Sequence, residues 1–129
     1  MSTIFTRIIN GELPAHKVAE TDSFLAFLDI NPLHEGHTLV VPKKEVDYLF
    51  DLEEELYLDF WKFAKEVSKK IEKVISCERI GVAVIGLEVP HAHIHLVPIS
   101  SVQDINFSRE KLILSNEELL STCNLIASA

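Results

Sequence analysis

An amphipathic pattern over residues 53–75 constrains the fold more than any other feature of the sequence. Its apolar residues recur at spacings of three and four, which places them on one face of a long helix. Acidic side chains crowd the start of the segment and lysines crowd its end, so both termini complement the helix dipole. Such a helix must cover a second layer with its apolar face, which consists of Leu56, Phe60, Phe63, Val67, Ile71 and Val74.

Five shorter segments predict a sheet as that second layer. Alternating or Val- and Ile-rich runs between turn residues are typical of strands. A capping box at residues 115–118 predicts a further helix near the C-terminus. The order predicts an α+β fold, with an antiparallel sheet of about five strands, one long helix and a C-terminal helix. The predicted strands are residues 16–20, 23–29, 37–41, 79–87 and 91–99.

Length and composition narrow the classes of protein. The chain has 129 residues and no repeat or linker-like run, so we expect a single domain over residues 1–129. A formal net charge of -8 disfavours DNA and RNA as partners, because nucleic-acid binding uses Lys and Arg to neutralise phosphates. Two separated cysteines and the lack of a long apolar run predict a cytoplasmic protein with no membrane partner.

Three histidines, His91, His93 and His95, alternate with apolar residues in the last predicted strand. Because side chains of a strand point alternately to its two faces, we expect the three imidazoles to share one face. An imidazole is a good nucleophile near neutral pH and a tunable acid or base. The row favours phosphate chemistry, in which the central imidazole attacks phosphorus while its neighbours bind phosphate oxygens and handle the leaving-group proton.

Two other uses of the histidine row stay open. The first is a polar strand face exposed to solvent. The second is a zinc site built from two of the histidines and a distant ligand, for which His37 or Asp29 is conceivable. All three rings would have to strain towards one ion, because at about 3.3 Å per residue the first and third Cα atoms lie roughly 13 Å apart.

The segment 91–97 resembles the H-φ-H-φ-H-φ-φ signature of the histidine triad (HIT) family, where φ is apolar. Residues 4–15, 27–32 and 36–44 resemble earlier blocks of that family in the same order. The resemblance implies a HIT-like fold and a Hint-like nucleotide hydrolase or transferase without a cofactor. It also implies a homodimer paired across the long helix and an adjoining strand, where Tyr57 and Trp61 lie beside the apolar stripe.

The resemblance further implies roles for individual residues. His93 would be the nucleophile and form a covalent nucleotidyl-histidine that water later releases. His95 would contact phosphate oxygens, while His91 and His37 orient the row and supply protons. Asp29 would bind both ribose hydroxyls, since a carboxylate accepts hydrogen bonds. The other substrate-binding residues would be Phe5, Ile8, Phe27, Ile30 and Val89.

The sequence departs from the family pattern just before the triad. Leu87 stands where Gln is usual, and the stretch that often carries an Asn is shortened. Glu88 cannot simply replace the missing amide, because a carboxylate near a phosphate repels it unless protonated. This departure bears on substrate choice and on expulsion of the leaving group.

The expected substrate is a purine nucleotide whose α-phosphate is joined to a leaving group as a phosphoramidate, nucleotidyl ester or dinucleoside polyphosphate. A second hypothesis is a nucleotide-binding or scaffold protein with weak or no turnover. A third is a zinc protein that uses the histidine row.

Overall fold

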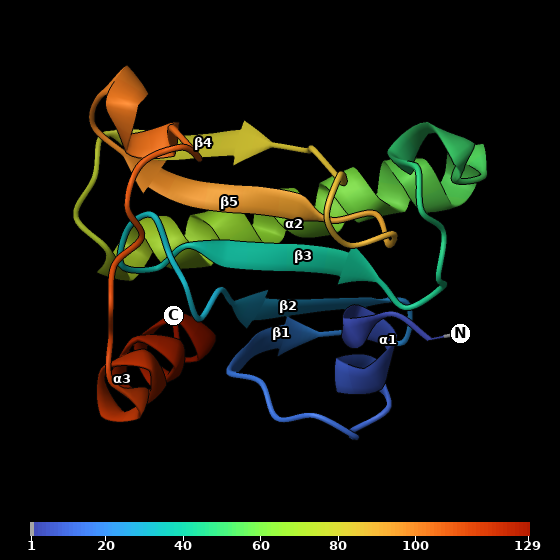
Figure 1. The fold of residues 1–129 in the computed structure, drawn as a ribbon, viewed down its shortest axis with the longest axis horizontal. Helices are drawn as coiled ribbons and strands as arrows, with labels where there is room; N and C mark the ends of the chain where they lie inside the picture. The colour runs from blue at the N-terminus through green and yellow to red at the C-terminus, as the bar shows by residue number, and fades with distance from the viewer. Residues whose placement is uncertain (1) are drawn as a thin grey trace.

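A computed structural model of the protein describes residues 2–129 (Figure 1). In this range the chain forms one sheet, three α-helices and two short 3-10 helices. The helices are α1 (Ile4–Ile9), α2 (Glu54–Val74), α3 (Asn116–Ala127), η1 (Leu49–Asp51) and η2 (Val102–Ile105). The strands are β1 (Lys17–Glu20), β2 (Phe24–Leu28), β3 (Thr38–Pro42), β4 (Arg79–Ala83) and β5 (Ile94–Ile99).

The five strands form an antiparallel sheet in the order β1-β2-β3-β5-β4. The predicted α+β fold is therefore confirmed. The central β3–β5 pairing sets Leu39 opposite His95 and Val40 opposite Ile94. This register decides which side chains of the two strands share a face.

Each face of the sheet has its own apolar cluster. On one face, α2 buries Phe60 and Ile71, and α3 adds Leu119 and Ile126 to the same core. On the other face lies α1 (Figure 1). Its Phe5 and Ile8 pack against side chains of β2 and β3. Because Ile94 and Leu96 point into the α2 core, His95 points to the face that carries α1. That face is where the site lies.

The last predicted strand is wrong at its start, since β5 begins at Ile94 rather than at residue 91. The β3–β5 ladder stops there because β3 ends at Pro42, which has no backbone N–H. The Pro42 carbonyl instead accepts a hydrogen bond from the His91 ring at 2.7 Å. Because β5 begins only at Ile94, β4 ends at Ala83, opposite His95, and residues 84–87 of the predicted strand 79–87 are not strand.

Residues 4–9 form a helix that the sequence did not predict, because six residues are too few for a periodic signal. Thr3 caps it by accepting a hydrogen bond from the backbone N–H of Thr6 at 3.1 Å. No helix within residues 2–129 has the length and apolarity needed to cross a membrane.

Candidate active site

A cleft of about 420 Å³ opens on the α1 face of the sheet. Six of the residues predicted for the site line it, and they come from α1, the turn between β2 and β3, the segment that leads into β5, and β5 itself. They are Phe5, Asp29, His37, Val89, His93 and His95. Further lining residues are Asn31, Leu39, Ile85, Gly86, Leu87, Glu88, Phe107 and Lys111.

His93 is held by the backbone of its own segment. Its Nδ1 lies 2.8 Å from the carbonyl oxygen of His91. A carbonyl can only accept, so Nδ1 carries the proton and Nε2 of the neutral ring keeps its lone pair. Phe5 packs edge-on against the imidazole, with ring centroids 5.0 Å apart. The orientation of His93 is thus fixed from two sides, and its free nitrogen is a nucleophile in chemical character.

His91 is fully buried and does not line the cleft. Its Nε2 donates to the Pro42 carbonyl, so Nδ1 accepts from the hydroxyl of Thr3 at 2.9 Å. Burial lowers the pKa of His91 and favours the neutral ring. Its side chain joins α1 to the end of β3, while its carbonyl orients His93.

Glu45 holds the N-terminal end of α1, whose Thr3 also contacts His91. Its Oε1 accepts hydrogen bonds from the Thr6 hydroxyl at 2.6 Å and from the Thr3 backbone N–H at 2.9 Å. The bond from Thr6, followed by that from Thr3, lowers the pKa of Glu45. Sequence reasoning did not find Thr3, Thr6 or Glu45, although a threonine before a helix is a recognised capping signal.

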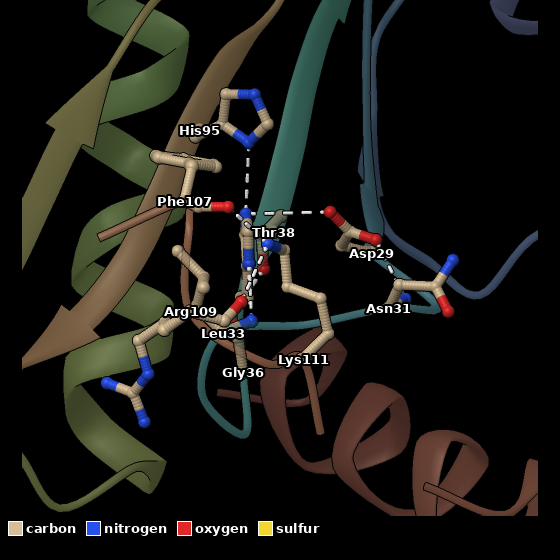
Figure 2. Close-up of polar contacts among 10 residues, drawn as sticks. Asp29, Asn31, Leu33, Gly36, Thr38, His95, Phe107, Arg109 and Lys111 are labelled. Carbon is tan, nitrogen blue, oxygen red and sulfur yellow. Dashed lines mark hydrogen bonds and ion pairs between the residues drawn. The ribbon is translucent and has the colours of Figure 1, made fainter. Parts of the chain in front are cut away.

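His37 and His95 form a second, directional pair. The backbone N–H of Leu33 donates to His37 Nδ1 at 3.0 Å, so the neutral His37 ring carries its proton on Nε2. That nitrogen lies 3.0 Å from His95 Nδ1 and donates to it, which puts the His95 proton on Nε2 (Figure 2). Burial lowers the pKa of His37 to about 3 and that of His95 to about 4. Both rings are neutral at pH 7, and His95 offers an N–H donor.

Asp29 has one oxygen in a turn and one near the histidines. Oδ1 accepts from the Asn31 backbone N–H at 2.8 Å, while Oδ2 lies 3.7 Å from His37 Nε2 (Figure 2). Because His37 is neutral, this contact is not an ion pair. Burial raises the pKa of Asp29. The turn role and an open carboxylate oxygen therefore coexist in one side chain.

Asp29, His37 and His95 bring three possible metal ligands within 4.8 Å of one another. A metal on His37 Nε2 would move the ring proton to Nδ1. There it would face the Leu33 N–H, so two donors would oppose each other. The ammonium of Lys111 in the same cleft adds repulsion of a cation. This donor set does not fit a metal ion.

Residues 10–102 match the HIT domain. The chain belongs to the HIT family. Its triad is His91, His93 and His95, of which the structure places two at the cleft and one behind it.

Named relatives extend the likeness beyond the matched domain. The chain is 38% identical over 123 residues to an uncharacterised HIT-like protein of Borreliella burgdorferi, covering 89% of this chain and 88% of that protein. It is 38% identical over 100 residues to adenosine 5'-monophosphoramidase hnt1 of Schizosaccharomyces pombe, covering 76% and 74%. A HIT-like protein of Bartonella henselae, described as involved in cell-cycle regulation, superposes with a TM-score of 0.84 at 29% identity, covering 98% and 95%.

The remaining predicted residues of the HIT site do not line the cleft. Phe27 is buried behind Phe5, with ring centroids 5.6 Å apart, and Ile8 packs in the same cluster. Ile30 is 63% exposed and Leu87, at the family's usual Gln position, is 89% exposed. The chain thus presents apolar surface at the cleft edge where its family often has an amide.

A segment that sequence analysis missed closes one side of the HIT site. Between η2 and α3, Phe107 packs edge-on against His95, with ring centroids 4.8 Å apart, and against His37 at 6.1 Å. Lys111 follows on the same segment and lines the cleft (Figure 2). Residues 106–112 carry no periodic pattern and no motif, so the sequence offered no signal for them.

Proposed function

We propose that this HIT protein is a nucleotide hydrolase or transferase that cleaves a bond at the α-phosphate through His93. The observation that carries the proposal is a pair of ring nitrogens at the cleft, one with a free lone pair and one with a proton. The His91 carbonyl leaves a lone pair on His93 Nε2, and the His37 contact leaves a proton on His95 Nε2. A nucleophile beside a donor for a phosphate oxygen suits attack on phosphorus.

The proposed reaction has two displacements. His93 Nε2 forms a bond to the α-phosphorus, and the leaving group departs with its bonding electrons and takes a proton from water. Water then attacks the nucleotidyl-histidine and returns the electron pair to Nε2, which yields a nucleoside monophosphate. Through both steps His95 donates to a phosphate oxygen and carries no charge of its own, because its pKa is about 4.

The substrate class follows from the relatives and from the cleft wall. The relative in Schizosaccharomyces pombe is an adenosine 5'-monophosphoramidase, which favours an adenine or other purine nucleotide as ligand. Asp29 would hold the ribose through Oδ2, since Oδ1 is occupied by the turn. Phe5 would contact the base, and Phe27, Ile8, Ile30 and Val89 would support or extend that apolar surface.

The test is turnover of an adenosine 5'-phosphoramidate by the native protein and by His93→Ala. We expect loss of turnover by at least about a thousandfold, because the attacking nitrogen is absent. Nucleotide affinity should change little, since Asp29 and Phe5 remain. Quenching without acid should trap nucleotide on His93 in the native protein, because a phosphorus–nitrogen bond is acid-labile. An active His93→Ala protein would exclude the mechanism.

A nucleotide-binding protein with weak turnover is the second candidate. The exposed Leu87 at the cleft edge favours it, because a leucine cannot bond to a phosphate or leaving group. Leu87→Gln distinguishes the two candidates. Large gain of turnover in this variant would indicate that the native chain is mainly a binder, whereas native turnover that Leu87→Gln barely changes would favour the enzyme.

A further inference from the structure

Lys111 is the sole cation among the described residues that line the cleft. Two carboxylates, those of Asp29 and Glu88, line the same cleft. Lys111 forms no ion pair within residues 2–129. Its positive charge therefore faces the cleft without a partnering carboxylate.

Backbone carbonyls, which carry only partial charge, hold this ammonium group in place. Lys111 Nζ donates to the carbonyl of Phe107 at 2.6 Å and to that of Arg109 at 3.2 Å. An ammonium has three N–H donors, so one remains free. The free donor and the full charge are available to a ligand.

The segment that carries Lys111 is fastened at both sides of the site. Phe107 packs against His95, and the backbone N–H of Leu112 donates to the carbonyl of Pro32 at 2.8 Å. The first contact ties the segment to the triad and the second ties it to the turn that follows Asp29. The charge is held beside the histidines by these contacts. Burial is the main cause of the lowered pKa of His37, and Lys111 adds to it; burial raises the pKa of Asp29, and Lys111 partly opposes that rise.

We propose that Lys111 is a subsite for a second anionic group of the substrate, carried by the leaving group beyond the phosphate that His93 attacks. This inference rests on the proposed function. The leaving groups that fit are a further phosphate, as in a polyphosphate chain, or an amine that bears a carboxylate. An anion on the ribose itself is disfavoured, because it would face the carboxylate of Asp29. No other lining residue described, Leu87 and Glu88 included, offers a cation to compete for such a group.

Equilibrium binding tests the subsite without any need for turnover. The ligands are AMP, ADP and adenosine 3',5'-bisphosphate, and the proteins are native, Lys111→Met, Lys111→Arg and Lys73→Met. We expect Lys111→Met to weaken the affinity for ADP by about tenfold and the affinity for AMP by less than about threefold, as is usual for loss of one charge-assisted contact. Lys111→Arg should retain most of the preference for ADP over AMP. Lys73→Met, which changes the net charge at an exposed position of α2, should retain all of that preference.

Turnover then links the subsite to the reaction. Two adenosine 5'-phosphoramidates are compared, one with β-alanine as leaving group and one with its methyl ester, which differ in one negative charge. Lys111→Met should lower kcat/KM about tenfold for the first and less than twofold for the second. Raised salt should reduce the native preference, because it screens an accessible charge pair.

Several outcomes would overturn the inference. Equal losses for ADP and AMP would show a structural role of Lys111, and so would equal losses for the two phosphoramidates. A Lys111-dependent advantage of adenosine 3',5'-bisphosphate over ADP would place the anion on the ribose instead. Absence of turnover in the native protein would defeat the proposed enzyme while the ADP and AMP affinities still decide whether the subsite exists.

Discussion

His37 donates a hydrogen bond from Nε2 to Nδ1 of His95 over 3.0 Å, and the direction of that bond is set by a backbone N–H on the far side of the ring. Protonation of either ring would disturb the pair. Burial accordingly lowers the pKa of both groups, to about 3 and about 4. The site is therefore built for neutral imidazoles, with a consequence for stability in acid.

Stability should fall as the pH drops below about 6.5. In the unfolded chain His37 and His95 take up protons near the ordinary pKa of about 6.5. In the folded chain His95 takes up its proton only near pH 4 and His37 only near pH 3. In this window each buried histidine lowers the free energy of unfolding by up to about 1.4 kcal/mol per pH unit. Urea denaturation at pH 7, 6 and 5 measures the slope.

His37→Asn is the matched variant for that measurement. Its amide can still accept from Leu33 but cannot reach His95, and it does not titrate. We expect a flatter slope between pH 6 and 5, above the range in which most carboxyl groups titrate. Identical slopes for the native protein and the variant would contradict the assignment of the stability loss in acid to the His37–His95 pair.

Asp29→Asn should weaken the affinity for AMP about tenfold with little change in melting temperature. The amide oxygen can still accept from Asn31, so the turn persists, but the charge that strengthens bonds from ribose hydroxyls is lost. Asp29→Ala is the contrast, since it loses the turn bond as well and should also melt lower. Titration calorimetry and thermal melting separate the two effects. Normal AMP affinity in Asp29→Asn would leave this residue with its turn role alone.

Thr3→Val should destabilise the protein by about 1–3 kcal/mol. It removes the cap of α1 and leaves buried His91 Nδ1 without its donor. Because α1 carries Phe5, which packs against His93, we also expect a lower kcat with KM less affected. Thr3→Ser keeps the hydroxyl and should behave like the native chain. A valine variant with native melting and native kcat would show that α1 is held without this bond.

Two copies should pair through α2 and the edge strand β4. β4 lies at the end of the sheet order, and Val82 on it is 50% exposed, as is Leu58 on α2 at 58%. Tyr57 and Trp61 lie on the same helix and are half-buried. Light scattering should give twice the chain mass of 14.6 kDa, and Val82→Lys should lower it. A mass of one chain across a wide concentration range would remove this prediction.

Chelation should leave turnover unchanged. The Leu33 N–H occupies the side of His37 that would need to carry the proton in a metal complex. Dialysis against EDTA, followed by assay with and without added zinc, measures the effect. Activity that falls on dialysis and returns with zinc would instead support the zinc hypothesis.

Much of the fold was accessible from local pattern. The long helix, the strand segments along the chain and the C-terminal capping box each depend on residues close together in sequence, so their periods and spacings report them directly. The HIT resemblance rests on blocks that are likewise local. Of ten residues predicted for the site, six line one cleft, and the resemblance implied roles for Asp29 and the apolar residues that periodicity alone would have assigned to a turn or to the core.

Tertiary structure decided what the histidines can do. The alternation of histidines predicted three rings on one strand face. In the structure the β3–β5 ladder stops before Pro42, and the buried His91 ring donates a hydrogen bond to the Pro42 carbonyl. Contacts far apart in sequence, such as Thr3 with His91 and His37 with His95, set the tautomer of each ring. Phe107 and Lys111 reach the cleft from a segment with no pattern of its own. The sequence by itself determined the long helix, the five strand segments and the family, because these follow from local spacing, whereas the short helix α1 and the start of β5 did not. Proton positions and the charge at the cleft depend on which distant groups meet, and that is a property of the folded chain alone.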